Sequence, residues 1–325
     1  MKIGIYGYGN IGRGVEAAFG NNPDASLFAI FTRRPPERVK SLTGAPVLSA
    51  ASVTDFKREI DVLIICGGSA TDLPALTPML AREFNVVDSF DNHSKISEHF
   101  KRVDKSACEG GKIALISSGW DPGLFSLARL YASAALPDGK SYTFWGRGIS
   151  QGHSDAIRRV EGVLDARQYT VPLDESLSLV REGKNPLLTP CNTHRRECYV
   201  VAKEGYDKEK IEREIKEMPS YFKGYDTTVK FVTEDELLKS HSGMPHGGSV
   251  IRCGRTGLFR ESLHTVEFSL TLKSNPEFTG GVLLASARAA YNMAERGDVG
   301  CKTIFDIPPG YFLRECDEKM RAELL

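Results

Sequence analysis

The sequence of 325 residues has no excess of charge of either sign, because 42 lysines and arginines face 42 aspartates and glutamates. A net charge of zero gives no general attraction to nucleic acid or to an anionic membrane surface. No apolar run approaches the length that spans a bilayer. The first residues, "MKIGIYGYGN", contain no apolar signal region with a small-residue cleavage site. We therefore expect a cytoplasmic protein that binds neither nucleic acid nor membrane.

CxxC pairs are also absent, and the seven cysteines, the last of them Cys316, are scattered along the chain. An odd number of unclustered cysteines favours a reducing compartment. Cys191, His194 and Cys198 lie close together in the sequence, but their spacing matches no common zinc site and no fourth ligand is obvious. We predict no metal site and interpret these residues as part of, or next to, a strand.

The run "KIGIYGYGNIGRGVEAAF" joins an apolar strand, a glycine turn and a helical pattern. Gly7, Gly9 and Gly12 form GxGxxG, in which the glycines allow a tight turn, close approach of the backbone to a pyrophosphate, and close packing of helix on strand. The N–H groups at the start of the helix favour a phosphate. The motif alone is also compatible with a structural turn, but its place between a strand and a helix favours dinucleotide binding.

Further apolar runs follow, at 60–66 ("IDVLIIC"), at 84–90 ("FNVVDSF") and in "GKIALISS", with helical segments such as "LPALTPMLAREF" between them. Strands alternating with helices predict a doubly wound parallel sheet of the Rossmann type. Ligands of such sheets bind beyond the carboxyl ends of the strands, where "CGGSATD" (66–72) and "SFDNH" (89–93) fall.

The second predicted strand, "ASLFAIF", ends in Thr32, Arg33 and Arg34, where an NAD-binding unit often has a carboxylate. Guanidinium groups pair with phosphate through charge-assisted, often bidentate hydrogen bonds. These residues therefore favour NADP, with its 2′-phosphate, over NAD. A solvated basic loop is the alternative.

After residue 120 the pattern changes to period-two alternation, for example in 141–146, 166–172, 196–202, 227–233 and 264–274. Such alternation indicates a sheet with one buried face. We predict a second, α+β domain with an open mixed sheet over residues 121–276. The first domain would comprise residues 1–120 and 277–325, because the helical run 279–297, which Gly297 would cap, can return to it.

Several polar stretches outside the nucleotide fold have simple structural interpretations when they are taken one at a time. Asp121 could begin a helix with Pro122 in its first turn. His246, in "HSGMPHGGS", could be a loop histidine, and Trp120 or Trp145 could be a core residue.

Together, these stretches resemble one family, the meso-diaminopimelate dehydrogenases. The matching segments, in family order, are "GYGNIGR", "FTRR", "CGGSATD", "DSFDNH", "SSGWDPG", "TFWGRGISQGHSDAIRR", "QYTVP", "THRREC", "YFKGY", "SGMPHGG", "HTVEF" and "NPEF". The residues before "HTVEF" do not align clearly, and the last forty or so carry no matching motif.

The resemblance implies an NADP-dependent, homodimeric enzyme of lysine and peptidoglycan precursor synthesis. Its reaction is the reversible oxidation of the D-centre of meso-2,6-diaminopimelate, which releases ammonia and L-2-amino-6-oxopimelate. A broader NADP-dependent D-amino acid dehydrogenase and a non-catalytic NADP-binding sensor are the alternatives.

The resemblance also implies the site residues. Two acids, Asp91 and Asp121, would lie at the reacting amine and relay protons, although the sequence does not decide which one does so. The other substrate-binding residues would be Trp120, Trp145, Gln151, Gly152, Thr170, Arg196, His246 and Asn275. The cofactor would contact Gly7, Tyr8, Gly9, Asn10, Ile11, Gly12, Thr32, Arg33, Arg34, Cys66, Gly67, Ser69, Ala70, Thr71 and Asp72.

Overall fold

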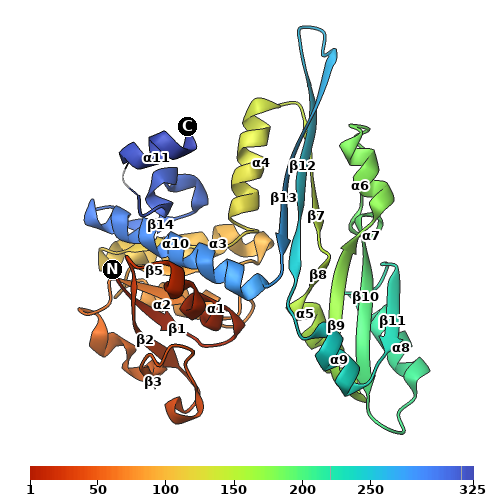
Figure 1. Cartoon of the computed structure of the whole chain (residues 1–325), viewed down its shortest axis with the longest axis horizontal. Coiled ribbons are helices and arrows are strands. Elements are labelled where there is room, and N and C mark those ends of the chain that lie inside the picture. The colour runs from red at the N-terminus through yellow and green to blue at the C-terminus, as the bar shows by residue number, and fades with distance from the viewer. Residues whose placement is uncertain (220, 316) are drawn as a thin grey trace. The chain divides into compact units, whose positions relative to one another are not determined.

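The computed structural model describes residues 1–219, 221–315 and 317–325, and it forms two compact units (Figure 1). Unit 1 comprises Met1–Leu127 and Pro276–Leu325, and unit 2 comprises Ala128–Asn275. The chain thus leaves the first unit once and returns to it.

A parallel sheet of seven strands forms the centre of unit 1, in the order β14-β6-β5-β4-β1-β2-β3. The strands are β1 (Lys2–Tyr6), β2 (Ser26–Thr32), β3 (Val47–Ser49), β4 (Val62–Ile65), β5 (Val86–Asp88), β6 (Ile113–Leu115) and β14 (Gly300–Lys302). The predicted Rossmann-type sheet is therefore confirmed. The edge strands β3 and β14 were not predicted, because neither lies within a longer apolar run such as those that contain the equally short β5 and β6.

Helices cover both faces of this sheet, as continuous apolar strands require. They are α1 (Asn10–Ala18), α2 (Leu73–Leu80), α3 (Ile96–Gly110) and α10 (Asn275–Glu295). Helix α4 (Leu124–Ala135) leads into unit 2, and the described residues of α11 (Asp317–Leu324) are mostly exposed. Alternate residues of β4 enter different cores, since Leu63 and Ile65 join α2 and α3 whereas Ile64 joins α1 and α10.

Helix α10 begins four residues before the predicted start of the helical run and ends at Glu295. Gly297 lies just beyond it with φ +84°. The N–H of Gly297 bonds to the carbonyl of Ala294, and the N–H of Asp298 bonds to the carbonyl of Met293. These two bonds form a Schellman motif, so the predicted capping role of Gly297 is confirmed.

Unit 2 contains two separate sheets (Figure 1). The mixed four-stranded sheet has the order β11 (Thr227–Phe231), β10 (His194–Ala202), β9 (Val163–Pro172) and β8 (Gly148–Ile149). The antiparallel three-stranded sheet has the order β13 (Ser262–Leu272), β12 (His246–Thr256) and β7 (Lys140–Trp145). The helices are α5 (Gln151–Arg158), α6 (Asp174–Arg181), α7 (Pro190–Thr193), α8 (Lys208–Glu217) and α9 (Glu234–His241).

Strand β12 differs from the loop that the turn residues of "HSGMPHGGS" suggested. The strand starts at His246 and runs through Gly247 and Gly248, whose φ angles are +137° and +153°. A Cβ on either glycine would meet a backbone carbonyl, that of Leu270 or that of Phe144. The glycines therefore permit close pairing of this strand with its neighbours.

Among the described residues, no helix combines the length and the apolar character that crossing a bilayer requires.

Candidate functional site

The strand order of unit 1 reverses at β1, which pairs with β2 on one side and with β4 on the other. Ligands of open α/β sheets bind at such a point, outside the carboxyl ends of the strands. The glycine turn follows β1 there, and Cys66 follows β4. The two loops pack directly against each other at Gly7, which has φ +93°. A Cβ on Gly7 would lie only 2.7 Å from the Cys66 carbonyl oxygen.

The three glycines of the turn have different surroundings. A Cβ on Gly12 would lie 2.3 Å from the Gly7 carbonyl oxygen, so only glycine lets α1 come this close to β1. A Cβ on Gly9 would meet nothing within 4 Å. Gly9 is also the N-cap of α1 and offers no side-chain cap, and the first turn has no acidic residue. Open backbone at an uncapped helix start suits the pyrophosphate of a dinucleotide.

The loop after β4 is a compact turn. The Gly68 carbonyl accepts hydrogen bonds from the N–H groups of Thr71, Asp72 and Leu73, and the Gly68 N–H donates to Asp72 Oδ2 over 3.0 Å. That bond is the main reason why the pKa of Asp72 lies below its ordinary value, with Arg33 adding to it. This loop, which approaches the glycine turn at Cys66, contains the predicted cofactor residues Cys66, Gly67, Ser69, Ala70, Thr71 and Asp72.

Both arginines after β2 turn toward these loops. Arg33 pairs with Asp72 Oδ1 over 2.9 Å, although two thirds of its side chain stays exposed. Arg34 donates from Nη2 to the carbonyl oxygen of Tyr8 and from its backbone N–H to Thr32 Oγ1. The solvated-loop interpretation does not explain these contacts. Both guanidinium groups therefore lie beside the loops that follow β1 and β4.

Glu16, on α1, is fully buried and was not predicted as a site residue. Its carboxylate accepts hydrogen bonds from the Tyr8 hydroxyl and from Ser41, Leu42 and Thr43. Burial would raise the pKa of Glu16, but these bonds outweigh burial and lower it to about 2. Burial, together with the bond to Glu16, raises the pKa of Tyr8 to about 12. Glu16 therefore ties the loop at 41–43 to the glycine turn.

Unit 1 also carries the predicted acids. Asp91 is exposed in the loop after β5, and its N–H donates to Ser69 Oγ over 3.1 Å. Trp120 and Asp121 lie in the loop after β6, the neighbouring strand, and the Trp120 ring packs edge-on against Phe125. Helix α4 starts only at Leu124, so Asp121 does not begin that helix.

In unit 2, Arg196 of β10 forms the centre of a second cluster. It donates from Nη1 to Thr170 Oγ1, and its guanidinium lies 4.2 Å from the centre of the Tyr225 ring. Its Nε is buried and has no hydrogen-bond partner among the described residues. A buried cation with an unsatisfied donor is suited to a carboxylate ligand.

His246 lies next to this pair through the strand register. Arg196 faces Thr170 across β10 and β9, and Thr170 faces Gly148 of β8. A Cβ on Gly148 would come within 2.4 Å of the His246 ring, so the glycine makes room for the imidazole. Nδ1 of the imidazole lies 2.8 Å from the Gly247 nitrogen and 3.2 Å from the Gly247 carbonyl oxygen.

Trp145 is held by His194. The Trp145 backbone N–H donates to His194 Nε2 over 2.8 Å, and the two rings stack with 5.5 Å between their centres. Burial, with a smaller effect of the Arg196 charge, lowers the pKa of His194 to about 4. The imidazole is therefore neutral near pH 7, as an acceptor at Nε2 must be.

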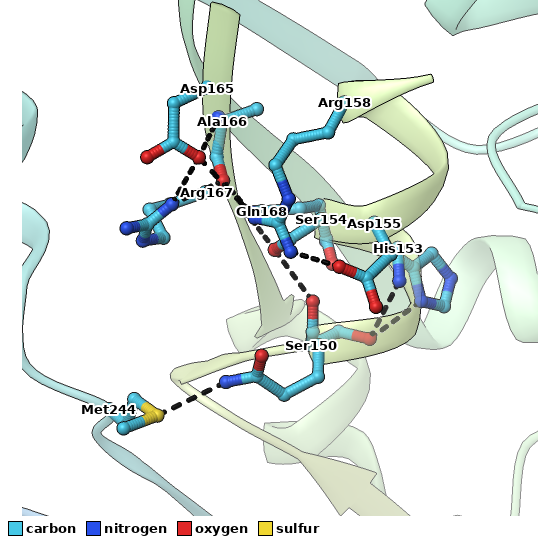
Figure 2. A network of polar contacts seen from close by, with 11 residues as sticks. Ser150, His153, Ser154, Asp155, Arg158, Asp165, Ala166, Arg167, Gln168 and Met244 are labelled. Atoms are coloured by element: carbon cyan, nitrogen blue, oxygen red, sulfur yellow. Dashed lines mark hydrogen bonds and ion pairs between the residues drawn. The ribbon is translucent and has the colours of Figure 1, made fainter. Parts of the chain in front are cut away.

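The remaining predicted substrate residues lie at the starts of two helices, α5 of unit 2 and α10, whose first residue is the last of unit 2. Gln151 and Gly152 open α5, and Gln151 Nε2 lies 3.1 Å from Met244 Sδ. Figure 2 shows how this helix is fixed, since Ser154 Oγ accepts from the Gln168 N–H and donates to the Ser150 carbonyl. Asn275 opens α10, and its N–H donates to the Met244 carbonyl over 2.8 Å.

The described residues contain no group of three or more His, Cys, Asp or Glu side chains that could hold a metal ion. The three residues that are close in sequence and could suggest a zinc site have separate structural roles. Cys191 lies on α7, His194 accepts a hydrogen bond from the Trp145 N–H, and Cys198 is in the core of unit 2. The described cysteines are free, and Cys316 lies outside the described residues.

Comparison with known proteins identifies close relatives. The model of the diaminopimelic acid dehydrogenase C-terminal domain matches residues 119–274. The meso-diaminopimelate D-dehydrogenase of Acetivibrio thermocellus is 55% identical over 326 residues, with 100% of this chain and 98% of that protein covered.

Solved structures agree with this similarity. The diaminopimelate dehydrogenase of C. glutamicum in complex with diaminopimelate has a TM-score of 0.92 and 42% identity, with 100% of this chain and 99% of that chain covered. An engineered D-amino acid dehydrogenase bound to NADP+ has a TM-score of 0.88 and 41% identity, with the same coverage.

The pKa of Glu16 leads to a prediction for acid stability. The folded pKa of about 2 lies below the ordinary 4.5, so the ionised side chain stabilises the fold above pH 4.5, and this contribution is lost as the pH falls toward 2. Glu16→Gln should lower the free energy of unfolding by about 1–3 kcal/mol at pH 7. The difference from the unmodified protein should shrink between pH 4.5 and 2 in denaturant titrations. A constant difference over that window would contradict the assignment.

Proposed function

The chain belongs to the meso-diaminopimelate D-dehydrogenase family, and we propose that it oxidises the D-centre of meso-2,6-diaminopimelate with NADP, giving L-2-amino-6-oxopimelate and ammonia. The observation that carries the proposal for the substrate is buried Arg196, with its unsatisfied Nε beside Thr170. A carboxylate is the ligand that such a group requires. The neighbouring His246 adds an imidazole that can donate a hydrogen bond.

We propose a division of labour between the units. Unit 1 is the dinucleotide-binding domain and handles the reacting D-centre through Asp91, Trp120 and Asp121. Unit 2 binds the rest of the substrate and carries the dimerisation surface. Its proposed substrate residues are Trp145, Gln151, Gly152, Thr170, Arg196, His246 and Asn275. Holding the L-centre fixes which α-hydrogen is presented for transfer, and thereby fixes the stereochemistry.

The chemistry at the D-centre has three requirements. The amine must be neutral when the α-hydrogen leaves with its electron pair, water must then add to the resulting imine, and ammonia must depart. Asp91 and Asp121 can accept and return the protons, and either one, alone or through water, can do so. NADP, when bound, supplies the acceptor for the hydride. The glycine turn at Gly7–Gly12 and Arg33 with Arg34 would hold its phosphates.

The alternatives make different demands. An NADP-binding sensor needs the dinucleotide turn, but it does not need a buried arginine such as Arg196 that can bind a substrate carboxylate. A D-amino acid dehydrogenase of broad specificity has no need of a group that recognises a second, distant carboxylate. Membership of a family of dehydrogenases and the Arg196 cluster both favour the specific enzyme.

The direct test follows NADPH absorbance with the meso, L,L and D,D isomers of diaminopimelate and with simple D-amino acids. The meso isomer should be turned over and the L,L isomer should not, because it has no D-centre. D-Alanine should react at least about 100-fold less efficiently, since it cannot use the charge-assisted bond to Arg196. Equal efficiency would identify the broad dehydrogenase. NADP binding without any absorbance change would identify the sensor.

The choice of cofactor has its own test. Replacing Arg33 and Arg34 together with alanine should weaken NADP binding by about 100-fold, because two charge-assisted contacts are lost. NAD binding should change less than about threefold. Arg38→Ala is the matched control, since Arg38 is an exposed arginine of the same loop. Titration calorimetry measures each affinity, and an equal loss for both dinucleotides would contradict the assignment.

We also propose a homodimer that forms through β13, the edge strand of the three-stranded sheet. One face of β13 is used within unit 2, where Glu267 pairs with Arg181 over 2.7 Å. The other face carries Val266 and Phe268, both about 40% exposed, and Tyr131 of α4 is 61% exposed. Exposed apolar groups on an edge strand suit a second copy of the chain. A cytoplasmic location stays a prediction from the sequence.

Light scattering tests the dimer. The expected mass is twice the 35.8 kDa of the chain. Val266→Arg should shift the protein toward the monomer, because it places a charge in the apolar contact. Leu238→Arg, at an exposed apolar residue on α9, should leave the dimer intact. A monomeric unmodified protein, or equal effects of the two variants, would remove β13 from the proposal.

A further inference from the structure

Asp88, the last residue of β5, is a fully buried carboxylate that the proposed chemistry does not use. Four donors surround it. Oδ1 accepts from the backbone N–H groups of Phe90 (3.1 Å) and Ser117 (2.9 Å). Oδ2 accepts from Thr77 Oγ1 (2.8 Å) and from His99 Nε2 (2.7 Å). A buried carboxylate needs this number of partners, because isolated burial of a charge costs several kcal/mol.

The two backbone donors belong to different loops. Phe90 immediately precedes Asp91, in the loop after β5. Ser117 begins the loop after β6 that leads to Asp121. The backbone carbonyl of Asp88 adds a third link, because it accepts from the Ser118 N–H over 2.9 Å. One oxygen atom, Oδ1, thus joins the loops that carry both proposed acids.

The opposite side of the carboxylate is equally well fixed. His99, on α3, donates to Oδ2 and stacks on the Phe90 ring, with 4.2 Å between ring centres and an interplanar angle of 18°. Thr77 holds Oδ2 from α2. The carboxylate therefore cannot rotate without breaking its hydrogen bonds to α2 and α3. Through Oδ1 it holds the two loops in a fixed position relative to these helices.

Ser117 shows that the loop requires this support. Its φ is +56°, a left-handed conformation that costs a residue with a side chain about 1 kcal/mol or more. The Ser117 N–H points to Asp88 Oδ1 in that conformation. Without the acceptor, the N–H would be buried without a partner, and the loop would relax toward a commoner backbone conformation.

We propose that Asp88 is a positioning residue that sets the placement of Asp91 and Asp121 through the single acceptor Oδ1. The inference rests on the proposed function, in which those acids serve the reacting centre. It adds a residue that contacts neither substrate nor cofactor but holds both acids in one geometry. A displacement of about 1 Å at such groups can cost about 100-fold in rate.

The experiment compares Asp88→Ala, Asp88→Asn and Thr77→Val in the full-length protein. Asparagine keeps an oxygen for the two loop N–H groups, and its amide can face Thr77 and the other tautomer of His99. Thr77→Val removes one bond from Oδ2 and leaves Oδ1 untouched, so it reports the effect of weakening the same buried carboxylate without releasing the loops.

Asp88→Ala should lower kcat with meso-diaminopimelate by about 100-fold, whereas NADP affinity stays within about twofold because the phosphate-binding loops do not depend on Oδ1. Asp88→Asn should recover at least a tenth of the original kcat. Thr77→Val should lower the unfolding temperature but keep kcat within about twofold. Equal kcat losses in Asp88→Ala and Thr77→Val, or no recovery in Asp88→Asn, would overturn the proposal. Asp88→Ser replaces the alanine variant if that one does not fold.

Hydrogen exchange separates this inference from the proposed function. In the protein without ligands, the Phe90 and Ser117 amides should exchange at least tenfold faster in Asp88→Ala than in Thr77→Val. Unchanged exchange would overturn the positioning role even in an active enzyme. Failure of the unmodified protein to oxidise any isomer of diaminopimelate would overturn the function, and the exchange rates would still decide whether Asp88 holds the two loops.

Discussion

Parallel pairing of the strands is the constraint on which unit 1 depends. It brings the carboxyl ends of β1, β2, β4, β5 and β6 to one edge of the sheet, so the loops that follow them must share that edge. The strands themselves are buried on both faces, and polar side chains such as Thr32 and Asp88 occur only at their ends. The chemistry of the unit is therefore concentrated in a few residues just beyond the strand ends, from Gly7 to Asp121.

Buried charges connect several loops of unit 1 to its helices. Glu16 binds the loop at 41–43 to α1, and Arg288 of α10 binds Asp24 and the Phe312 carbonyl. Each charge makes several hydrogen bonds, which offset the loss of hydration. Removing one partner would leave a desolvated donor or acceptor, so each network holds its loop in one arrangement. Arg196 differs from Glu16 and Arg288, because its Nε has no partner among the described residues, and the proposed substrate carboxylate would supply one.

The main strands of the sheet and the glycine turn could be predicted because each has a strong local signal, either a continuous apolar run or a fixed spacing of glycines. Arg33 and Arg34 follow the second strand as the sequence indicated, and their part in cofactor binding stays a prediction. Glu16 and Asp88 could not, because a single acid in a helix or at a strand end normally indicates exposure, and only the fold shows that both are buried. The strand at His246 was missed for a related reason, since its glycines serve close strand pairing and look locally like a turn.

Three histidines of unit 2 are held neutral near pH 7 by burial. Burial, aided by the Arg196 cation, lowers the pKa of His153 and His194 to about 4, and burial lowers the pKa of His246. Protonating His194 would destroy the acceptor for the Trp145 N–H. The low pKa of His194 and this hydrogen bond are therefore consistent with each other. Near neutral pH, His153 and His194 should then contribute nothing to the pH dependence of turnover.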